Sequence, residues 1–419
     1  MSRAGQGELG ALLRSPGFFR LWMIGLAGNS MRWLEVLAAA LFTLDVTGSG
    51  LAVAAVSAAR TMPMLLFGAL AGVVSEAVDR KRLLLAALAV SALSAAAVAA
   101  LAAGGMARPW HLALAGFVSG TVWSTEMSTR RRMVGEVAGR RIARAMALDS
   151  VTGSTTRMVG PLLGGIGYQL VGLPGAYAFS ACMYLLGTVL VLGLHHEQVP
   201  QRLRLARVPA DLAEGFAFAR ANTMVLCVLG ITVAMNLCGF AYTALEAPIG
   251  REVFDVSAAL VGVLAAAEPF GCLIGGLVLA GWDVRLGDRR QFAGGSALFL
   301  IVLMVMPFSP VFSLALGLLW IGGFGTAAFS NLQSTLILTA APPTMRSRLM
   351  GILTVCIGTG PLGLLLIGVL ADWFGPRLAL LIMAAVGLAG TIAVGLLWSR
   401  HDRRAGAAPL AAMAPQDGN

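Results

Sequence analysis

The chain has 419 residues, of which 58% are hydrophobic and only 12% are charged, and its mean hydropathy is +0.83. Soluble domains carry about 25% charged residues, so this composition excludes a cytosolic enzyme, a disordered chain and a disulfide scaffold. Twelve membrane spans would leave about 35 residues for each span and its loop, which is enough for about 20 apolar residues plus a connection. We therefore predict an all-α polytopic membrane protein.

Apolar runs separated by short polar breaks predict twelve transmembrane helices. Their approximate ranges are 18–44, 50–77, 83–104, 109–128, 146–170, 175–194, 222–249, 256–281, 291–308, 311–337, 347–371 and 376–398. The longest polar interruption, 195–221, contains the amphipathic stretch DLAEGFAFAR. The expected organisation is a six-helix bundle over 1–194, a cytoplasmic linker over 195–221, a second six-helix bundle over 222–399 and a disordered cytoplasmic tail over 400–419.

The net charge of +10 is explained by basic residues in the loops, so it indicates a membrane surface and no nucleic acid partner. With the N-terminus inside, 24 Lys and Arg fall in cytoplasmic segments and three in outer loops, at Arg108, Arg251 and Arg377. This bias predicts that both termini are cytoplasmic. The five cysteines have no C-x-x-C spacing, and no metal site or cofactor is expected.

Two weak internal repeats suggest that the chain consists of two related halves. Gly160-Pro161-Leu162 recurs as Gly360-Pro361-Leu362, and Gly175 corresponds to Gly375 at the same offset of 200 residues. A second offset of 208 residues pairs features of the second helix with those of the eighth, including Arg60 with Glu268. Parallel repeats of this kind build two pseudo-symmetric bundles in transporters, although coincidence of composition is the alternative.

The loop after the second helix, in GALAGVVSEAVDRKRLLL, combines a small residue with acidic and basic ones. It resembles the Gly-x-Leu-Ala-Asp-Arg-x-Gly-Arg-Lys signature of the major facilitator superfamily, with Ala77 and Asp79 in place of the usual Arg and Gly. The resemblance implies a cytoplasmic gate made by Gly72, Glu76, Asp79, Arg80 and Lys81. Looser versions are LAGWDVRLGDRR and GVLADWFGPR.

The fifth helix carries RMVGPLLGGIGYQL, with Gly160, Pro161, Gly164 and Gly165. This motif resembles the glycine–proline signature of antiporters and exporters in the same superfamily. Pro161 removes one helical hydrogen bond, and the glycines permit close helix packing against the opposite half. An ordinary contact between small residues is the alternative interpretation.

Over residues 14–399 the chain resembles the enterobactin-exporter-like branch of the superfamily. The stretches that carry the likeness are SPGFFRLW, TGSGLAVAAVSAARTMPMLLFGALAG, RIARAMALDS, RMVGPLLGG and GPLGLLLIGVLADWFGPR. The resemblance implies the major facilitator fold, in which two six-helix bundles rock about a central site lined by helices 1, 4, 7 and 10. It also implies a multi-pass protein of the bacterial inner membrane. The first helix departs from the branch by reading GNSMRWLEV.

Charges within predicted spans cost a few kcal/mol, so each must face protein or water. On the first helix, Arg32 and Glu35 are three residues apart and share a face with Asn29. We expect this face to form a ligand or proton site, and a structural ion pair is the alternative. Because helices 5 and 8 pack together in the family, Arg157 and Glu268 are expected to pair across the interface.

Other polar residues within spans are weaker candidates. Arg60, like Arg157, is expected to be a charge at the interface of the two halves; both resemble arginines that are usual in this branch, and a structural role is the alternative for both. The remaining candidates for the substrate or proton site are Asn236, Glu246, Asn331 and Gln333. Polar side chains in membranes also serve as contacts between helices, so cavity lining is one of two interpretations.

The sequence predicts a secondary active transporter that exports a small amphipathic or organic molecule by alternating access. Proton antiport is the expected energy source, since the chain has no Walker-type G-x-x-x-x-G-K-[ST] motif. The expected partners are a small-molecule substrate, protons and the lipid bilayer, and the protein is expected to be a monomer. A proton-coupled importer of a polar metabolite and a non-transporting membrane sensor are the alternatives, and no enzymatic activity is expected.

Overall fold

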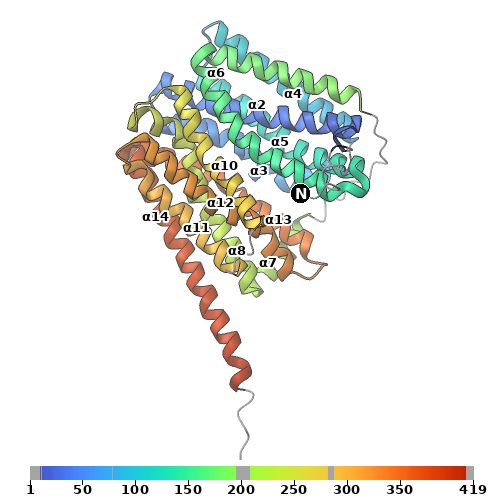
Figure 1. Ribbon diagram of the computed structural model, residues 1–419, viewed down its shortest axis with the longest axis vertical. Helices are drawn as coiled ribbons and strands as arrows, with labels where there is room; N and C mark the ends of the chain where they lie inside the picture. Colours follow the sequence, from blue (N-terminus) through green and yellow to red (C-terminus); the bar gives the residue numbers. More distant parts are fainter. Residues whose placement is uncertain (1–9, 11, 78, 195–207, 282–286, 412–419) are drawn as a thin grey trace, which may run out of the picture.

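The computed structural model describes residues 10, 12–77, 79–194, 208–281 and 287–411, and these residues form helices joined by short connections (Figure 1). The first half contains α2 (Pro16–Thr47), α3 (Gly50–Ala77), α4 (Arg80–Ala103), α5 (Pro109–Ala138), the short η1 (Gly139–Arg141) and α6 (Ile142–Leu192). The second half contains α7 (Val208–Ala221), α8 (Thr223–Ala234), η3 (Met235–Gly239), η4 (Phe240–Leu245), α9 (Glu246–Pro248), η5 (Ile249–Val253), α10 (Ala258–Gly281), α11 (Asp288–Val305), η6 (Met306–Phe308), α12 (Phe312–Ala340), α13 (Arg346–Ile357) and α14 (Gly360–Ala411).

Twelve membrane spans can be traced through the described residues. Eight helical stretches are long and apolar enough to cross a membrane, and α2 and α5, with 32 and 30 residues, are long enough but more polar. Two of the eight stretches contain a glycine with positive φ, at Gly172 (64°) and Gly375 (79°), and each therefore comprises two spans. Both turns lie in the predicted breaks between 146–170 and 175–194 and between 347–371 and 376–398, and the residue that shares the positive φ of Gly375 is Gly172, whereas the internal repeat had paired Gly175 with Gly375.

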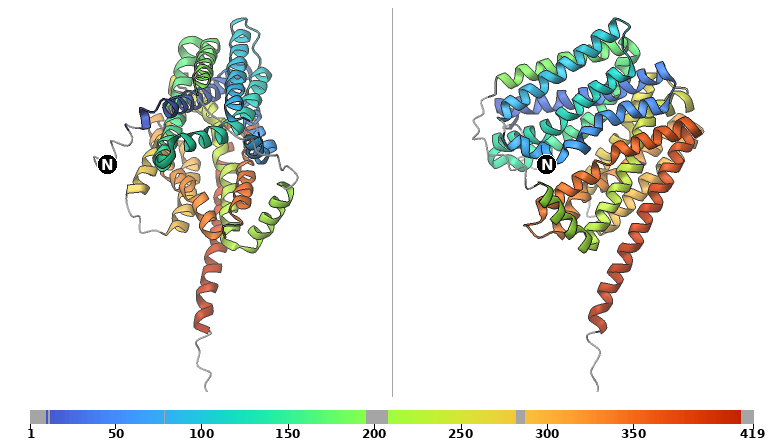
Figure 2. Two further views of the ribbon diagram at one scale, coloured as in Figure 1. Left: turned by 90° about the vertical axis from the view of Figure 1, so that its right-hand side faces the viewer. Right: turned by 180° about the vertical axis from the view of Figure 1, so that it is seen from behind.

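The spans form two bundles that have separate hydrophobic cores. One core is made of residues between Leu12 and Leu194, and the other is made mainly of residues between Ala219 and Trp398. Figure 2 shows the two bundles meeting at one end and diverging toward the N-terminus. We call the end at which α2 begins the Pro16 end and the opposite end the Thr47 end.

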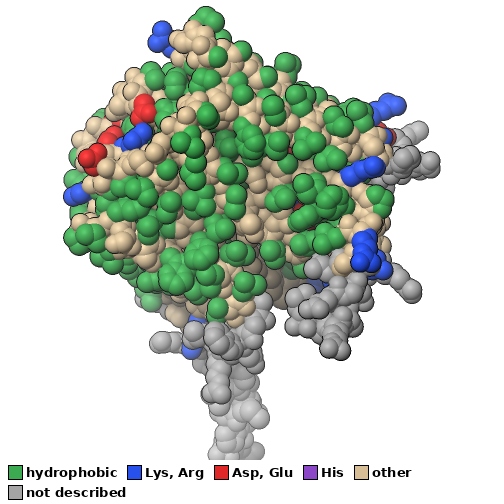
Figure 3. Space-filling view, turned by 45° about the horizontal axis from the view of Figure 1, so that its top comes forward, with side chains coloured by type: hydrophobic (Ala, Val, Ile, Leu, Met, Phe, Trp, Pro, Cys, Tyr) green, Lys and Arg blue, Asp and Glu red, His purple; other side chains and the backbone are tan. Residues whose placement is uncertain are grey.

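At the Thr47 end the two bundles are packed closely against each other. A third apolar cluster joins the bundles there and includes Leu41 and Leu44 of α2 with Ala258 and Val261 of α10. In the space-filling view, hydrophobic side chains are spread over the visible face, while charged side chains lie mainly near its edges (Figure 3). This distribution fits a surface that is surrounded by lipid.

The seventh span is irregular, which its apolar sequence did not predict. It runs from Thr223 to Val253 through an α-helix, a π-helix at Met235–Gly239, a 3₁₀-helix at Phe240–Leu245 and a second π-helix at Ile249–Val253. Such π segments are frequent at functional sites. The eleventh span is also interrupted, between α13 and α14 at Gly358 and Thr359.

Several boundaries differ from the predicted ranges. Helix α5 continues to Ala138, so the basic run Arg130-Arg131-Arg132 is helical and not a loop. Helix α14 continues to Ala411, so residues 400–411 are helical where a disordered tail was expected. Of the expected linker, 195–207 lies outside the described residues, and the amphipathic stretch that follows it lies in α7.

Candidate functional site

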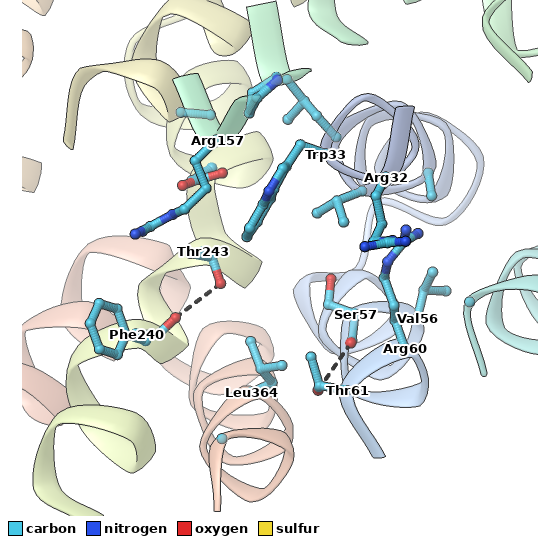
Figure 4. Close-up of a pocket in the computed structure, with 18 of the residues that line it drawn as sticks. Arg32, Trp33, Val56, Ser57, Arg60, Thr61, Arg157, Phe240, Thr243 and Leu364 are labelled. Atoms are coloured by element: carbon cyan, nitrogen blue, oxygen red, sulfur yellow. Dashed lines mark hydrogen bonds between the residues drawn. The ribbon is translucent and has the colours of Figure 1, made fainter. Parts of the chain in front are cut away.

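A cavity of about 430 Å³ lies between the two bundles and is the main candidate site (Figure 4). This volume is within the range of pockets that bind small molecules. In Figure 4, Arg32, Trp33 and Arg157 lie on one side of the space, and Phe240, Thr243 and Leu364 lie on another. The site therefore receives side chains from both halves of the chain.

The lining helices differ in part from those that the family resemblance implied. Helices 1, 4 and 7 do contribute, through α2, α5 and the irregular seventh span, but none of the lining residues comes from α12, the tenth span. Instead α3, α6, α10 and the segment from Ile357 to Leu364 complete the wall. Helix α12 lies behind α10, where the backbone at Gly323 closely approaches Gly271 and Cys272.

Arg157 and Glu268 form the expected ion pair across the two halves. Arg157 on α6 donates to Glu268 Oε2 on α10 at 2.8 Å, and Glu268 is completely buried. The hydroxyl of Thr326 on α12 donates to the other carboxylate oxygen, Oε1. The Arg157 guanidinium also lies 5.7 Å from the centre of the Trp33 ring, within the range of a cation–π contact. Both oxygens of Glu268 therefore have partners.

Arg32 and Glu35 are both buried, but they have different partners and only Arg32 lines the main cavity. Arg32 lines the cavity, donates to Asn29 Oδ1 at 2.9 Å and forms an ion pair with Glu126 of α5. Its guanidinium lies 5.8 Å from the Trp123 ring centre. Glu126 is also buried, so this ion pair lies inside the protein and away from the cytoplasmic surface.

Glu35 points into the interior of the first bundle and does not line the main cavity. Its partner is Arg60 of α3, at 3.4 Å, and Arg60 also donates to the Ser119 hydroxyl at 3.1 Å. Glu35 Oε1 is buried without a hydrogen-bond partner, as is the hydroxyl of Tyr184. Both residues line a second cavity of about 10 Å³, which approaches the space that one water requires. Arg60 lines both cavities and links them.

Two of the four remaining candidates lie at the site, and two do not. Asn236 and Glu246 of the irregular seventh span line the cavity. Gln333 is buried inside the second bundle, where its amide donates to the Thr232 hydroxyl at 2.9 Å. It therefore connects α12 with α8, which is the alternative interpretation of a contact between helices. Asn331 lies on the exposed face of α12. Since α12 does not reach the cavity wall, neither α12 residue lines it.

The glycine–proline motif packs against both halves. A Cβ at Gly160 would lie 2.9 Å from the Ser30 carbonyl oxygen, and one at Gly164 would lie 2.7 Å from that of Leu34, so both glycines contact α2 of their own half. A Cβ at Gly165 would lie 3.0 Å from Gly262 Cα in the other half. Pro161 lines the cavity. Only Gly165 therefore serves the close contact between halves that the motif predicted for its glycines.

The described part of the loop motif forms bonds within the first bundle. Asp79 caps α4 by accepting from the Arg82 amide at 2.9 Å, Arg80 pairs with Glu136 of α5, and the Lys81 ammonium donates to the Leu192 carbonyl at 3.1 Å. The Gly72 and Glu76 positions belong to α3, but their surroundings lie outside the described side chains. A gate across the two halves is therefore still a prediction for this motif.

A connection between halves that the sequence did not indicate occurs at the Thr47 end. Asp372 of α14 accepts from the Ser49 hydroxyl at 2.9 Å and from the Leu51 amide at 3.0 Å, and so caps the N-terminus of α3. Asp45 and Arg251 approach each other at 3.9 Å, and Gln169 accepts from the Ala259 amide at 3.0 Å. We call the contacts of Asp372 with Ser49 and Leu51 the latch. The motif GVLADWFGPR, which contains Asp372, could have indicated it, because the predicted topology places the loop of this motif on the outer side.

The site can hold a small molecule between apolar walls and charged groups that reside on different halves. Among the described residues, no group of three or more His, Cys, Asp or Glu side chains could hold a metal ion.

Comparisons with known proteins agree with this architecture. The chain is 28% identical to the multidrug efflux pump Tap of Mycolicibacterium fortuitum, over 88% of this chain and 92% of that protein. It is 27% identical to the enterobactin exporter EntS of Salmonella typhi, over 78% of each chain. It is 22% identical to the staphyloferrin A transporter of Staphylococcus aureus, over 85% of this chain and 89% of that one.

Solved structures share the fold at low sequence identity. The nucleoside transporter NupG, in a variant form, superposes with a TM-score of 0.74 at 14% identity, over 90% of this chain and 99% of that one. A bacterial homologue of the human lysosomal transporter Spinster, described as inward-facing and occupied, gives 0.73 at 14% identity, over 91% and 96%. Residues 10–416 match the family described as transmembrane secretion effector. The chain is therefore a membrane transporter, not an enzyme, and it belongs to the transmembrane secretion effector family of the major facilitator superfamily.

Proposed function

We propose that this protein uses proton antiport to export a small amphipathic or organic molecule, and that it does so by alternating access. The observation that carries the proposal is the cavity of about 430 Å³, which lies between two separately packed bundles and contains ionisable groups from both. A site between two rigid bodies can be exposed to either side of the membrane in turn when the bodies rock. A ligand bound there would cross without the chain itself unfolding.

The direction of transport is inferred from the relatives and from the charges. Tap and EntS are named as an efflux pump and an exporter, and the loop bias of 24 to three basic residues supports cytoplasmic termini. In that orientation the Pro16 end is cytoplasmic, and the latch of Asp372 with Ser49 and Leu51 lies on the outer side. The described conformation would then receive substrate from the cytoplasm.

Proton coupling is supported by the carboxylates in and beside the cavity. Glu268 is paired with Arg157 across the two halves, so rocking would change that contact. Glu35 is proposed as the coupling acid because Oε1 lacks a partner and its single ion pair, with Arg60, connects it to the cavity wall. Asn29, Arg32, Asn236 and Glu246 are proposed as the substrate-facing polar groups.

A monomer in the bacterial inner membrane is the proposed working form, because one chain supplies the whole cavity wall. The proposal is tested by growing a deletion strain, and the same strain complemented with the gene, on a panel of drugs and metabolites with and without a protonophore. Export predicts that the deletion strain retains more of at least one compound, and that the protonophore removes the difference. Reduced uptake by the deletion strain would indicate an importer, and no difference across the panel would favour a sensor.

A further inference from the structure

The positive and negative charges of the ionisable groups in and around the cavity are unequal in number. Three arginines, Arg32, Arg60 and Arg157, line the cavity. Four carboxylates belong to the same cluster, two on the cavity wall and two paired behind it: Glu246, Glu268, Glu35 and Glu126. When every group is ionised, one negative charge is left without a positive partner.

The ion pairs identify which carboxylate is left over. Arg32 pairs with Glu126, and Arg60 pairs with Glu35. Arg157 pairs with Glu268, whose second oxygen accepts from Thr326. No ion pair with Glu246 occurs in the part of the chain that the structure describes. Glu246 is therefore the uncompensated carboxylate of the cavity.

The position of Glu246 suits contact with a ligand. It lies in the irregular seventh span, immediately after the 3₁₀-helix η4, and its half-buried side chain faces the cavity. The ionisable groups that face it are Glu268 of α10, Arg157 of α6 and the hydroxyl of Tyr242 on its own span. Because Arg157 is already engaged by Glu268, these neighbours leave the local charge at minus one.

An ionised carboxylate without a partner is unstable in a low-dielectric site unless a proton or a cation neutralises it. Much of the cavity wall is apolar, and Leu37, Met64, Phe240 and Leu364 face the same space as Glu246. Such a wall favours a cation whose charge is surrounded by hydrophobic groups over a strongly hydrated ion.

We infer that Glu246 is the binding site for the positive charge of a lipophilic monovalent cation, and that this cation displaces a proton from the same carboxylate. The inference rests on the proposed export function and names its substrate class. Exchange of one proton for one cation at Glu246 keeps the net charge of the cavity constant. Glu246 thus binds the substrate cation and releases one proton in exchange, while Glu35, behind the cavity wall, remains the proposed coupling acid for the rocking of the two bundles.

The test compares two probes of the same shape and opposite charge, tetraphenylphosphonium and tetraphenylborate, on the purified full-length protein. We expect the cation to bind at least about tenfold more tightly than the anion, which corresponds to about 1.4 kcal/mol. In weakly buffered solution, binding of the cation should release protons, and addition of the anion should not. Comparable affinities for the two ions, or tighter binding of the anion, would overturn the inference without any variant.

Variants then assign the effect to one residue. Glu246→Gln should lower the affinity for tetraphenylphosphonium about tenfold and abolish the proton release, while Glu246→Asp should restore both. Glu252→Gln is the matched control, because Glu252 is an exposed carboxylate in η5 of the same span and does not line the cavity. Undiminished cation binding by Glu246→Gln would show that the inference is wrong. Proton-driven export of panel compounds could still hold in that case, so the two failures are distinguishable.

Discussion

Asp372 and Leu51 join the two halves of the molecule at the Thr47 end, where the Asp372 carboxylate accepts from the Leu51 amide at 3.0 Å. The second carboxylate oxygen accepts from the Ser49 hydroxyl at 2.9 Å, so one side chain of the second bundle caps the first turn of α3 in the other. Capping of exposed amides at a helix N-terminus contributes about 1 kcal/mol. Because these bonds join the two bundles, they stabilise the closed arrangement of that end.

Asp372→Ala should therefore shift the protein toward conformations that are open at the Thr47 end. The expected shift is about fivefold, from the loss of about 1 kcal/mol of capping energy. It can be measured as the rate at which an impermeant maleimide labels a cysteine introduced at Val36, which lines the cavity, in a cysteine-free background. Asp288→Ala, at an exposed position on α11, is the control. Equal labelling rates in the Asp372→Ala and Asp288→Ala proteins would show that Asp372 does not stabilise the closed Thr47 end.

Gly165→Ala should also hinder closure of the Thr47 end. The added methyl group would lie 3.0 Å from Gly262 Cα and would contact the Ala258 carbonyl oxygen, so α6 and α10 would have to separate. We expect faster labelling from the Thr47 side and slower transport. Gly153→Ala is a matched control on the same helix, since a Cβ there would meet nothing within 4 Å. A Gly165→Ala protein that behaves like the Gly153→Ala protein would contradict the role of this contact.

The ion pair between Arg157 and Glu268 is expected to be essential for stability as well as for transport. Removal of one partner of a buried pair costs about 3–5 kcal/mol because the other charge is left uncompensated. Glu268→Gln should impair transport and lower the thermal stability of the purified protein. The double variant Arg157→Glu/Glu268→Arg should regain assembly. Wild-type stability and transport in both single variants, Arg157→Gln and Glu268→Gln, would show that the pair has no such role.

Glu35→Gln should abolish proton-driven transport while leaving expression normal. The neutral amide cannot exchange a proton, and it also frees Arg60, which lies 3.4 Å from the carboxylate. Exchange of labelled for unlabelled substrate without a pH gradient should persist, because Glu35 does not line the main cavity. Proton-driven flux at the wild-type level in this variant would reject Glu35 as the coupling acid.

Much of the fold could be predicted because a membrane requires apolar runs of about 20 residues, which are visible in a single sequence. The Arg157–Glu268 pair was also predictable once the fifth and eighth spans were placed side by side. The partner of Arg32 was not, because a long side chain can reach any neighbouring helix, and here it reaches Glu126 on α5 rather than Glu35 on its own helix.

The irregularity of the seventh span could not be predicted, since the stretch from Thr223 to Val253 is apolar enough overall to be expected as a single regular helix. Its π and 3₁₀ segments depend on packing against other helices, which local sequence does not encode. The turns at Gly172 and Gly375, by contrast, lie in the breaks predicted between 146–170 and 175–194 and between 347–371 and 376–398. Glycines at 172 and 175 both permit positive φ, and only the tertiary structure selects one of them.

The central claim is that a proton gradient drives substrate outward through the cavity between the bundles. Everted membrane vesicles test it most directly, because an acidic interior then mimics the outside of the cell. With a compound identified by the growth screen, the account predicts accumulation inside vesicles that contain the protein, and loss of that accumulation when a protonophore is added. Accumulation that is unchanged by the protonophore, or that requires an alkaline interior, would contradict it.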